Sequence, residues 1–256
     1  MKATICELPN DRDVLSNAWL ELVKHVTANA SEMVILPEMP FFRWLPHTKE
    51  VNVAQWEEAV QAHVEWMQRL DELAPATVIS TRPIAAHGKR SNVGYVWESG
   101  KAVVDAHVKY YLPDEPAFWE ATWYARGEKE FSSVTTNHCK VGFLICTELW
   151  FNAHTREYGK QGIDVLACPR GTPSSTTEKW IAGGRTAAVV SGAFCLSSNL
   201  TGRTGDGRDF GGRGWIIDPE GNVLGLTSTE KPFLTLDLDL VESANAKQTY
   251  PRYVLD

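Results

Sequence analysis

The chain has 256 residues, of which 43% are hydrophobic and 22% are charged. This composition is ordinary for a globular protein and excludes a mainly disordered chain, and the length allows one large domain or two small ones. The formal net charge of −7 without a basic run argues against a nucleic-acid partner. The sequence contains no run of about 18 apolar residues, so a membrane span is not expected.

Short apolar runs rich in β-formers alternate with helix-like stretches in the first half of the chain. Strands are predicted at residues 2–8, 33–36 and 77–81, and amphipathic helices at 13–28 and 53–73. Residues 92–97 and 101–109, joined by the Glu-Ser-Gly sequence at 98–100, are typical of a β-hairpin. Residues 140–146 are almost continuously apolar, as expected of a strand that is buried on both faces.

The second half continues the same alternation. A helix is predicted after Phe151 and another at 177–190, and strands at 164–168, 193–198, 215–217, 223–226 and 233–238. The glycine-rich segment 202–214 is predicted to be a loop; it lacks the Gly-Lys-Ser/Thr ending of a phosphate-binding loop. Because no linker-like composition interrupts the pattern, we expect one α/β domain with mixed sheets over residues 1–256.

Five cysteines, at positions 6, 139, 146, 168 and 195, are scattered without a Cys-x-x-Cys pair. An odd and dispersed set fits neither a disulfide framework nor a zinc cluster. The N-terminus meets Glu7 and Pro9 before a signal-peptide core could form. We therefore expect a cytoplasmic protein with reduced thiols, most of them buried and inert, and no bound metal.

Three polar residues stand where apolar strands end: Glu38, Lys109 and Cys146. Ligands of α/β proteins usually bind beyond the carboxyl ends of strands. Taken singly, each residue has an ordinary explanation, since a strand-end cysteine is usually an inert thiol and a strand-end lysine or glutamate is usually solvated. Their occurrence together favours a catalytic site with a cysteine nucleophile.

Residues 36–38, 109–113 and 142–148 resemble the glutamate, lysine and cysteine motifs of the nitrilase superfamily of carbon–nitrogen hydrolases. Residues 195–202 and 211–221 resemble its later strands, so the resemblance covers essentially the whole chain. It implies a four-layer αββα sandwich with two mixed β-sheets and hydrolysis of a non-peptide carbon–nitrogen bond without a cofactor. It also implies at least a homodimer, with the apolar C-terminal tail, about 241–256, at the interface.

The resemblance implies that Cys146 attacks the substrate, that Glu38 accepts the thiol proton, and that Lys109 stabilises negative charge on the substrate. A thiol with an ordinary pKa near 8.5 is mostly protonated at neutral pH and therefore requires a base. An amide or N-carbamoyl group would lose ammonia and leave a thioester, which water activated by Glu38 would hydrolyse. The best match to a second pocket glutamate is Glu120, followed by Glu115.

Four further residues are predicted to contact the substrate. Thr147 would offer its backbone N–H to a developing oxyanion, Trp119 and Phe42 are aromatic neighbours of the motifs, and Arg170 would bind a carboxylate. For Arg170 a structural ion pair is an equal alternative. His107, two residues before Lys109, is expected to lie in the surroundings of the site.

The sequence leaves the substrate open among small amides, N-carbamoyl compounds and nitriles. A nitrilase would use the same three residues. A cysteine–histidine hydrolase would instead depend on a histidine and tolerate the loss of Lys109. A binding protein that kept the fold and lost turnover is a further alternative, and it should contain no rapidly alkylated cysteine.

Overall fold

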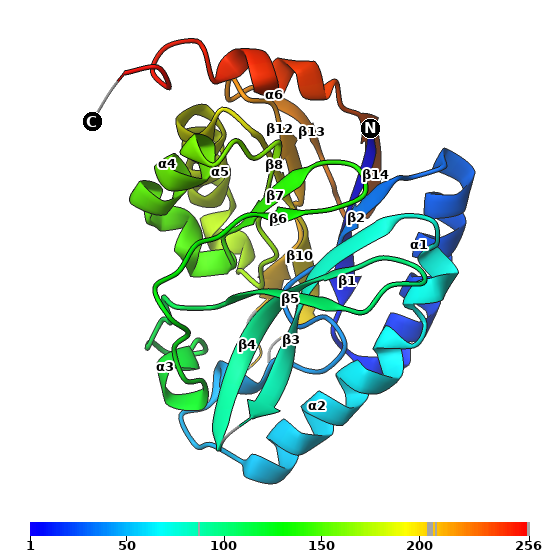
Figure 1. Ribbon diagram of the computed structural model, residues 1–256. Helices are drawn as coiled ribbons and strands as arrows, with labels where there is room; N and C mark the ends of the chain where they lie inside the picture. Colours follow the sequence, from blue (N-terminus) through cyan, green and yellow to red (C-terminus); the bar gives the residue numbers. More distant parts are fainter. Residues whose placement is uncertain (87, 204–206, 208, 255–256) are drawn as a thin grey trace.

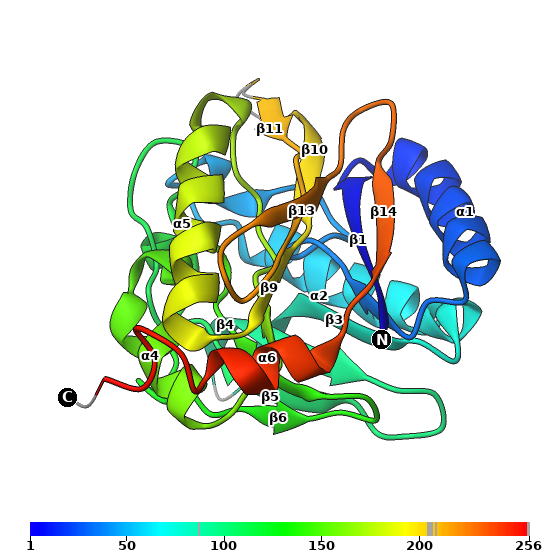
Figure 2. The ribbon, with the colours of Figure 1, turned by 90° about the horizontal axis from the view of Figure 1, so that it is seen from above.

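A computed structural model describes residues 1–86, 88–203, 207 and 209–254. Two mixed β-sheets lie face to face, and helices cover the outer face of each, α1 (Arg12–Asn29) and α2 (Val53–Met67) on one side and α4 (Asn152–Lys160) and α5 (Thr177–Ser191) on the other (Figure 1). Seen from above, α1 and α5 lie on opposite sides of the strands (Figure 2). This arrangement confirms the expected α/β architecture with two mixed sheets.

The first sheet has the strand order β11-β10-β1-β2-β3-β4-β5, and β14 pairs with the first part of β1. Strands β1, β2 and β3 are parallel, whereas β3, β4 and β5 are antiparallel. The strands are β1 (Lys2–Pro9), β2 (Met33–Ile35), β3 (Thr77–Ala86), β4 (Lys89–Trp97), β5 (Val104–Val108), β10 (Asn199–Arg203), β11 (Asp209–Gly211) and β14 (Phe233–Asp237).

The second sheet has the order β13-β12-β9-β8-β7-β6, with β7, β8 and β9 parallel. Its strands are β6 (Val134–Thr135), β7 (Lys140–Phe143), β8 (Val165–Ala167), β9 (Phe194–Ser197), β12 (Trp215–Ile217) and β13 (Val223–Leu226). The shorter helices are α3 (Glu120–Trp123), α6 (Leu240–Ala246) and the 3-10 helices η1 (Leu45–His47), η2 (Leu70–Leu73), η3 (Cys146–Trp150) and η4 (Ser174–Thr176).

Alternation along the strands divides the buried side chains among three apolar layers. In β1, Ile5 points into the layer between the two sheets, while Leu8 points into the layer beneath α1 and α2. The layer between the sheets joins residues of β1, β2 and β3 to Phe143, Leu196 and Ile216 of the second sheet. A third layer lies between the second sheet and helices α4 and α5. The order of layers is therefore helix, sheet, sheet, helix.

Several predicted elements differ from the structure. The helix predicted at 53–73 ends at Met67 and continues as the separate turn η2, and the strand predicted to reach Cys146 ends at Phe143. The prediction of a loop throughout 202–214 was wrong where it overlaps β10 and β11, which pair with each other and bury Phe210. Part of that segment, 204–206 and 208, lies outside the described residues, as does the end of the C-terminal tail, 255–256. Helix α3 was not predicted.

Among the described residues, no helix has both the length and the apolar character that crossing a bilayer requires.

Candidate active site

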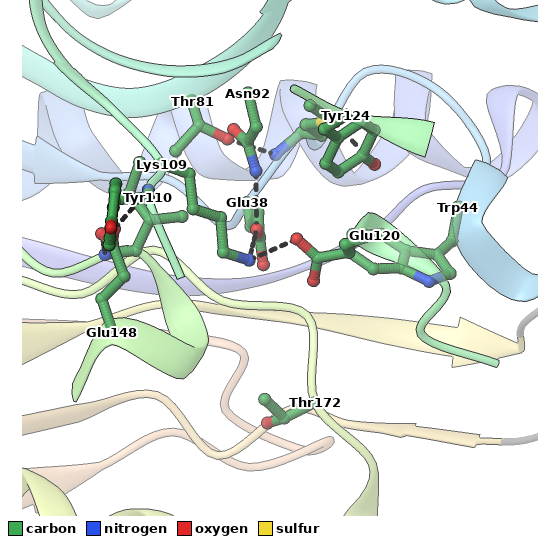
Figure 3. Close-up of polar contacts among 12 residues, drawn as sticks. Glu38, Trp44, Thr81, Asn92, Lys109, Tyr110, Glu120, Tyr124, Glu148 and Thr172 are labelled. Atoms are coloured by element: carbon green, nitrogen blue, oxygen red, sulfur yellow. Dashed lines mark hydrogen bonds and ion pairs between the residues drawn. The ribbon is translucent and has the colours of Figure 1, made fainter. Parts of the chain in front are cut away.

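Two strand ends and the start of a helix bring ionisable side chains to one place. Glu38 follows β2, Lys109 follows β5, and Glu120 begins α3. The Lys109 ammonium lies 2.7 Å from Oε1 of Glu38 and 2.6 Å from Oε2 of Glu120 (Figure 3). All three side chains are 0% exposed, so their charges act on one another with little screening by water.

Polar contacts fix the carboxylate of Glu38. The side-chain amide of Asn92 on β4 donates to Oε1 at 2.7 Å, and the following residue, Met39, donates its backbone N–H to Oγ1 of Thr81 at 2.9 Å (Figure 3). Within the described part of the chain, the buried Oε2 of Glu38 has no hydrogen-bond partner. That oxygen is therefore available to accept a proton.

Cys146 is the first residue of η3, in the sharp turn that follows β7. Its backbone φ is 50°, in the left-handed region where a residue with a Cβ atom is strained by about 1–2 kcal/mol. The N–H of Cys146 donates to the carbonyl of Pro169 at 3.0 Å, and the backbone of Gly171 acts to lower the pKa of the thiol. The turn is thus fixed to the loop that follows the neighbouring strand β8.

The charges of the site determine its resting protonation. Burial raises the pKa of the Cys146 thiol well above its usual range, the charge of Glu38 raises it further, and Lys109 opposes them. Burial likewise raises the pKa of Glu120 to about 8, against the effect of Lys109. Burial alone would lower the pKa of Lys109, but the carboxylates of Glu120 and Glu38 raise it instead. At neutral pH the site holds an ammonium and a neutral thiol.

The thiol opens into a pocket of about 280 Å³. Cys146, Glu120 and Thr147 line it, while Glu38 and Lys109 lie buried behind them. Thr147 is the second residue of η3, where backbone N–H groups have no acceptor within the helix. The other lining residues are Pro113, Glu115, Phe118, Trp150, Gly171, Thr172, Pro173, Thr176, Lys179 and Trp180.

Arg170, predicted either to bind a substrate carboxylate or to form a structural ion pair, does not line this pocket. Its guanidinium is 1% exposed, lies 4.2 Å from the ring centre of Trp215, and donates to Ser197 Oγ at 2.9 Å and to the carbonyl oxygens of Gly212 and Arg213. Burial lowers its pKa to about 10. The side chain connects the loops behind the pocket, so its donors are already engaged.

Trp119 and Phe42 also lie outside the pocket. The ammonium of Lys49 lies over the ring of Trp119, 4.6 Å from its centroid, and the guanidinium of Arg43 lies over the ring of Phe42 at 5.6 Å. Both rings pack against the apolar cluster that contains Trp56 and Trp123, so their proximity to the motifs in sequence does not bring them to the pocket wall.

Sequence reasoning missed several residues of the site. Asn92 had one usable signal, a polar residue at the start of the apolar run 92–97, and it is 1% exposed. Gly171 contributes only a backbone N–H, and Trp180 comes from an ordinary helical pattern, so neither had a local signal. Among the described residues, no cluster of three or more histidine, cysteine, aspartate or glutamate side chains is placed to bind a metal ion.

Known proteins share both the sequence and the fold. The mouse (Mus musculus) omega-amidase NIT2 is 27% identical over 198 residues, which cover 73% of this chain and 71% of that protein. The 2-oxoglutaramate amidase of Bacillus subtilis is 30% identical over 112 residues, covering 44% and 43%, and the N-carbamoylputrescine amidase of Solanum tuberosum is 28% identical over 94 residues, covering 34% and 30%.

Solved structures establish the fold. A carbon-nitrogen hydrolase from Helicobacter pylori G27 matches with a TM-score of 0.86 at 18% identity, covering 98% of this chain and 94% of that one. A mutant amidase from Nesterenkonia sp. AN1, with acrylamide added to its active-site cysteine, matches with a TM-score of 0.77 at 17% identity, covering 96% of both chains. The family model of the carbon-nitrogen hydrolases matches residues 2–248, and the chain therefore belongs to that family.

Proposed function

We propose that the protein hydrolyses a small carboxamide, releasing ammonia through a thioester on Cys146. The observation that carries this proposal is the buried group of Glu38, Lys109 and Glu120 behind a strained cysteine at the wall of one pocket. The omega-amidase and the 2-oxoglutaramate amidase named above support an amide as substrate.

In the first step the sulfur of Cys146 attacks the amide carbon while the thiol proton moves to Oε2 of Glu38. A base is required because the pKa of the buried thiol is raised. The carbonyl oxygen becomes an oxyanion, stabilised by the Lys109 ammonium and the N–H of Thr147. Glu38 returns the proton to the amide nitrogen, the C–N bond breaks, and ammonia leaves.

In the second step a water molecule attacks the thioester and gives a proton to Glu38. The C–S bond breaks, the carboxylic acid is released, and the proton returns to the sulfur. The sum is amide and water giving acid and ammonia, with Glu38 and Cys146 regenerated. Glu120 hydrogen-bonds the Lys109 ammonium throughout and keeps it directed at the oxyanion.

We further propose that the substrate carries an acidic tail. Lys179, on α5, lines the pocket, and no partner for its amine is found in the part of the chain that the structure describes. The aromatic rings of Trp150 and Trp180, 5.0 Å apart, form an apolar wall for a short aliphatic stem. Together they fit an ω-amide of a dicarboxylate, with its free carboxylate at Lys179.

The experiment is ammonia release from 2-oxoglutaramate, N-carbamoylputrescine, a neutral aliphatic amide and a nitrile, with wild type beside Cys146→Ala. Release by wild type alone, fastest from 2-oxoglutaramate, is expected. Lys179→Met should raise KM for that substrate and leave the neutral amide unchanged. Preference for the nitrile, or equal release by both proteins, would contradict the proposal.

Two rival mechanisms receive less support. A cysteine–histidine hydrolase would need a free imidazole near the thiol, but both ring nitrogens of His107 are engaged, with Glu148 and the carbonyl of Glu130. A non-catalytic binding protein would not need the buried ammonium of Lys109. Burying this charge costs free energy, and without catalysis no function would offset that cost.

We also propose, as an assembly for this enzyme, a homodimer formed through the C-terminal tail. Val241, Tyr250 and Tyr253 expose 59%, 73% and 60% of their surface, a concentration of apolar groups on one short segment. Sedimentation should give the mass of a dimer, and Tyr250→Ser combined with Tyr253→Ser should shift it toward the monomer. A wild-type monomer at micromolar concentration would contradict this assembly.

A further inference from the structure

The buried carboxylate of Glu148 has no part in the reaction described above. Glu148 stands two residues after Cys146 in η3, is 0% exposed and does not line the pocket. We propose that Glu148 is a positioning residue that holds the Cys146 turn and the Lys109 strand end in one geometry, with His107 as its partner. The proposal rests on the function proposed for Cys146 and Lys109.

The two oxygens of Glu148 bind the immediate neighbours of both functional residues. The backbone N–H of Ile145, just before Cys146, donates to Oε2 at 2.9 Å. The backbone N–H of Tyr110, just after Lys109, donates to Oε1 at 2.8 Å (Figure 3). One side chain therefore fixes the main chain beside the nucleophile and beside the ammonium.

His107 closes this arrangement from the other side. Its Nε2 lies 3.0 and 2.9 Å from the two oxygens of Glu148, and its Nδ1 lies 3.2 Å from the carbonyl oxygen of Glu130. Both ring nitrogens therefore face oxygen atoms, and the ring is held from two sides. The ring also packs against Phe131, with centroids 4.7 Å apart, so the contact between His107 and Glu148 is held in a fixed orientation.

The topology explains why such a contact is needed. Lys109 follows β5 of the first sheet, whereas Cys146 follows β7 of the second, and no ladder pairs these two strands. The isolated bridge between Arg170 and Asn199 joins the sheets elsewhere, beside β8 and β10. Backbone pairing between β5 and β7 therefore does not set the distance between ammonium and thiol. A displacement of 1 Å in a catalytic geometry lowers the rate by about 100-fold, so a side chain that spans the two sheets here acts directly on catalysis.

The test is Glu148→Gln, which keeps the volume but replaces one acceptor oxygen by an amide that donates toward N–H groups. We expect kcat to fall by about 100-fold with KM within a small factor, because the pocket wall is intact. Alkylation of Cys146 by iodoacetamide, followed by mass spectrometry, should slow as well. His107→Leu should act in the same direction, and His107→Gln, which keeps a donor toward Glu148, should restore part of the rate.

Ser243→Ala is the matched control for a general loss of buried polar contacts. Ser243, a residue of α6, is 0% exposed, and its hydroxyl hydrogen-bonds the carbonyl oxygens of Ile163 and Gly192. This variant should lose stability and keep kcat and the alkylation rate. Equal losses of kcat in Ser243→Ala and Glu148→Gln would show that Glu148 is merely structural and overturn the proposal.

The two proposals fail in different ways. If Cys146→Ala turns over like wild type, the proposed function is wrong, whatever Glu148 does. If Cys146→Ala is inactive but folded Glu148→Gln keeps the wild-type kcat and alkylation rate, only the positioning role is wrong. Should Glu148→Gln not fold, His107→Leu decides: unchanged kcat and alkylation in a folded protein overturn the role, and a fall in both supports it.

Discussion

The apolar layer between the two sheets and the group behind the pocket are equally buried but differ in what burial does to them. Ile5, Phe143 and Ile216 are 0% exposed, and burying each large apolar side chain stabilises the fold by about 1.5–3 kcal/mol. Lys109 and Glu120 are also 0% exposed, yet removing their charges from water costs free energy that their pairing only partly offsets.

The backbone shows the same contrast. None of the described buried residues of the apolar layer has a positive φ, whereas the turns that hold the site contain Met39 and Cys146 at φ values of 43° and 50°. Positive φ values and buried charge therefore coincide at the pocket, whereas the apolar side chains of the layer between the sheets bring neither. We infer that the first region supplies stability and that the second draws on it for chemistry.

The largest expected effect separates two equally buried cysteines. Cys146→Ala should lower turnover by at least about 10⁴-fold and change the free energy of unfolding little, because its thiol already faces a pocket. Cys168→Ala, at a 0% exposed position of an apolar layer, should instead lower stability by about 1 kcal/mol and keep turnover. Ammonia release measures turnover, and urea unfolding measures the free energy of unfolding. Loss of turnover in folded Cys168→Ala would contradict the expected difference between the two cysteines.

A smaller effect is expected for Lys109→Met, with a pH dependence that the apolar layer lacks. Loss of an oxyanion donor should lower kcat by about 10²–10³-fold. Without the ammonium, the carboxylates of Glu38 and Glu120 remain buried together, so the folded state binds protons that the unfolded state releases. Stability relative to wild type should therefore decline as pH rises from 5 to 8.

Ile216→Val is the control for that pH dependence. It removes one methylene from the layer between the sheets and should cost about 0.5–1.5 kcal/mol at every pH. Urea unfolding at pH 5 and pH 8 compares the two variants. A pH-independent loss of stability in Lys109→Met would mean that the two carboxylates do not depend on the ammonium for their charge.

How much of this the sequence could predict depends on the kind of signal. Apolar runs locate strands, and the ends of those strands locate Glu38, Lys109 and Cys146. Such a run can be recognised in the sequence without knowing which other strands it pairs with. The direction in which a side chain points after a turn cannot be predicted in the same way, because it depends on the local φ and ψ. Arg170 and Gly171 are adjacent, yet only Gly171 lines the pocket.

Long-range pairing was the second source of error. Residues 199–203 form β10 because Asn199 pairs with Glu7, on a strand at the opposite end of the chain. Their glycine-rich surroundings give no local sign of that partner. The same holds for Asn92 and Trp180, which become part of the site only through residues more than 30 positions away.

The smallest expected effect concerns the proton on Glu120. Burial raises its pKa to about 8, so between about pH 4.5 and 8 the folded state keeps a proton that the unfolded chain releases. The free energy of unfolding should therefore decrease as pH rises through this window. Glu120→Gln removes the titrating group, and its melting temperature should fall less between pH 5.5 and 8 than that of wild type.

Glu115→Gln, which changes an exposed carboxylate at the mouth of the same pocket, should keep the wild-type slope. The difference between the slopes then measures how far Glu120, behind the pocket, is protonated in the folded protein. Equal slopes in wild type and Glu120→Gln would mean that Glu120 is already ionised at pH 5.5. In that case both carboxylates beside the ammonium would be ionised at rest. Burying the site would then cost more free energy than it does when Glu120 is neutral.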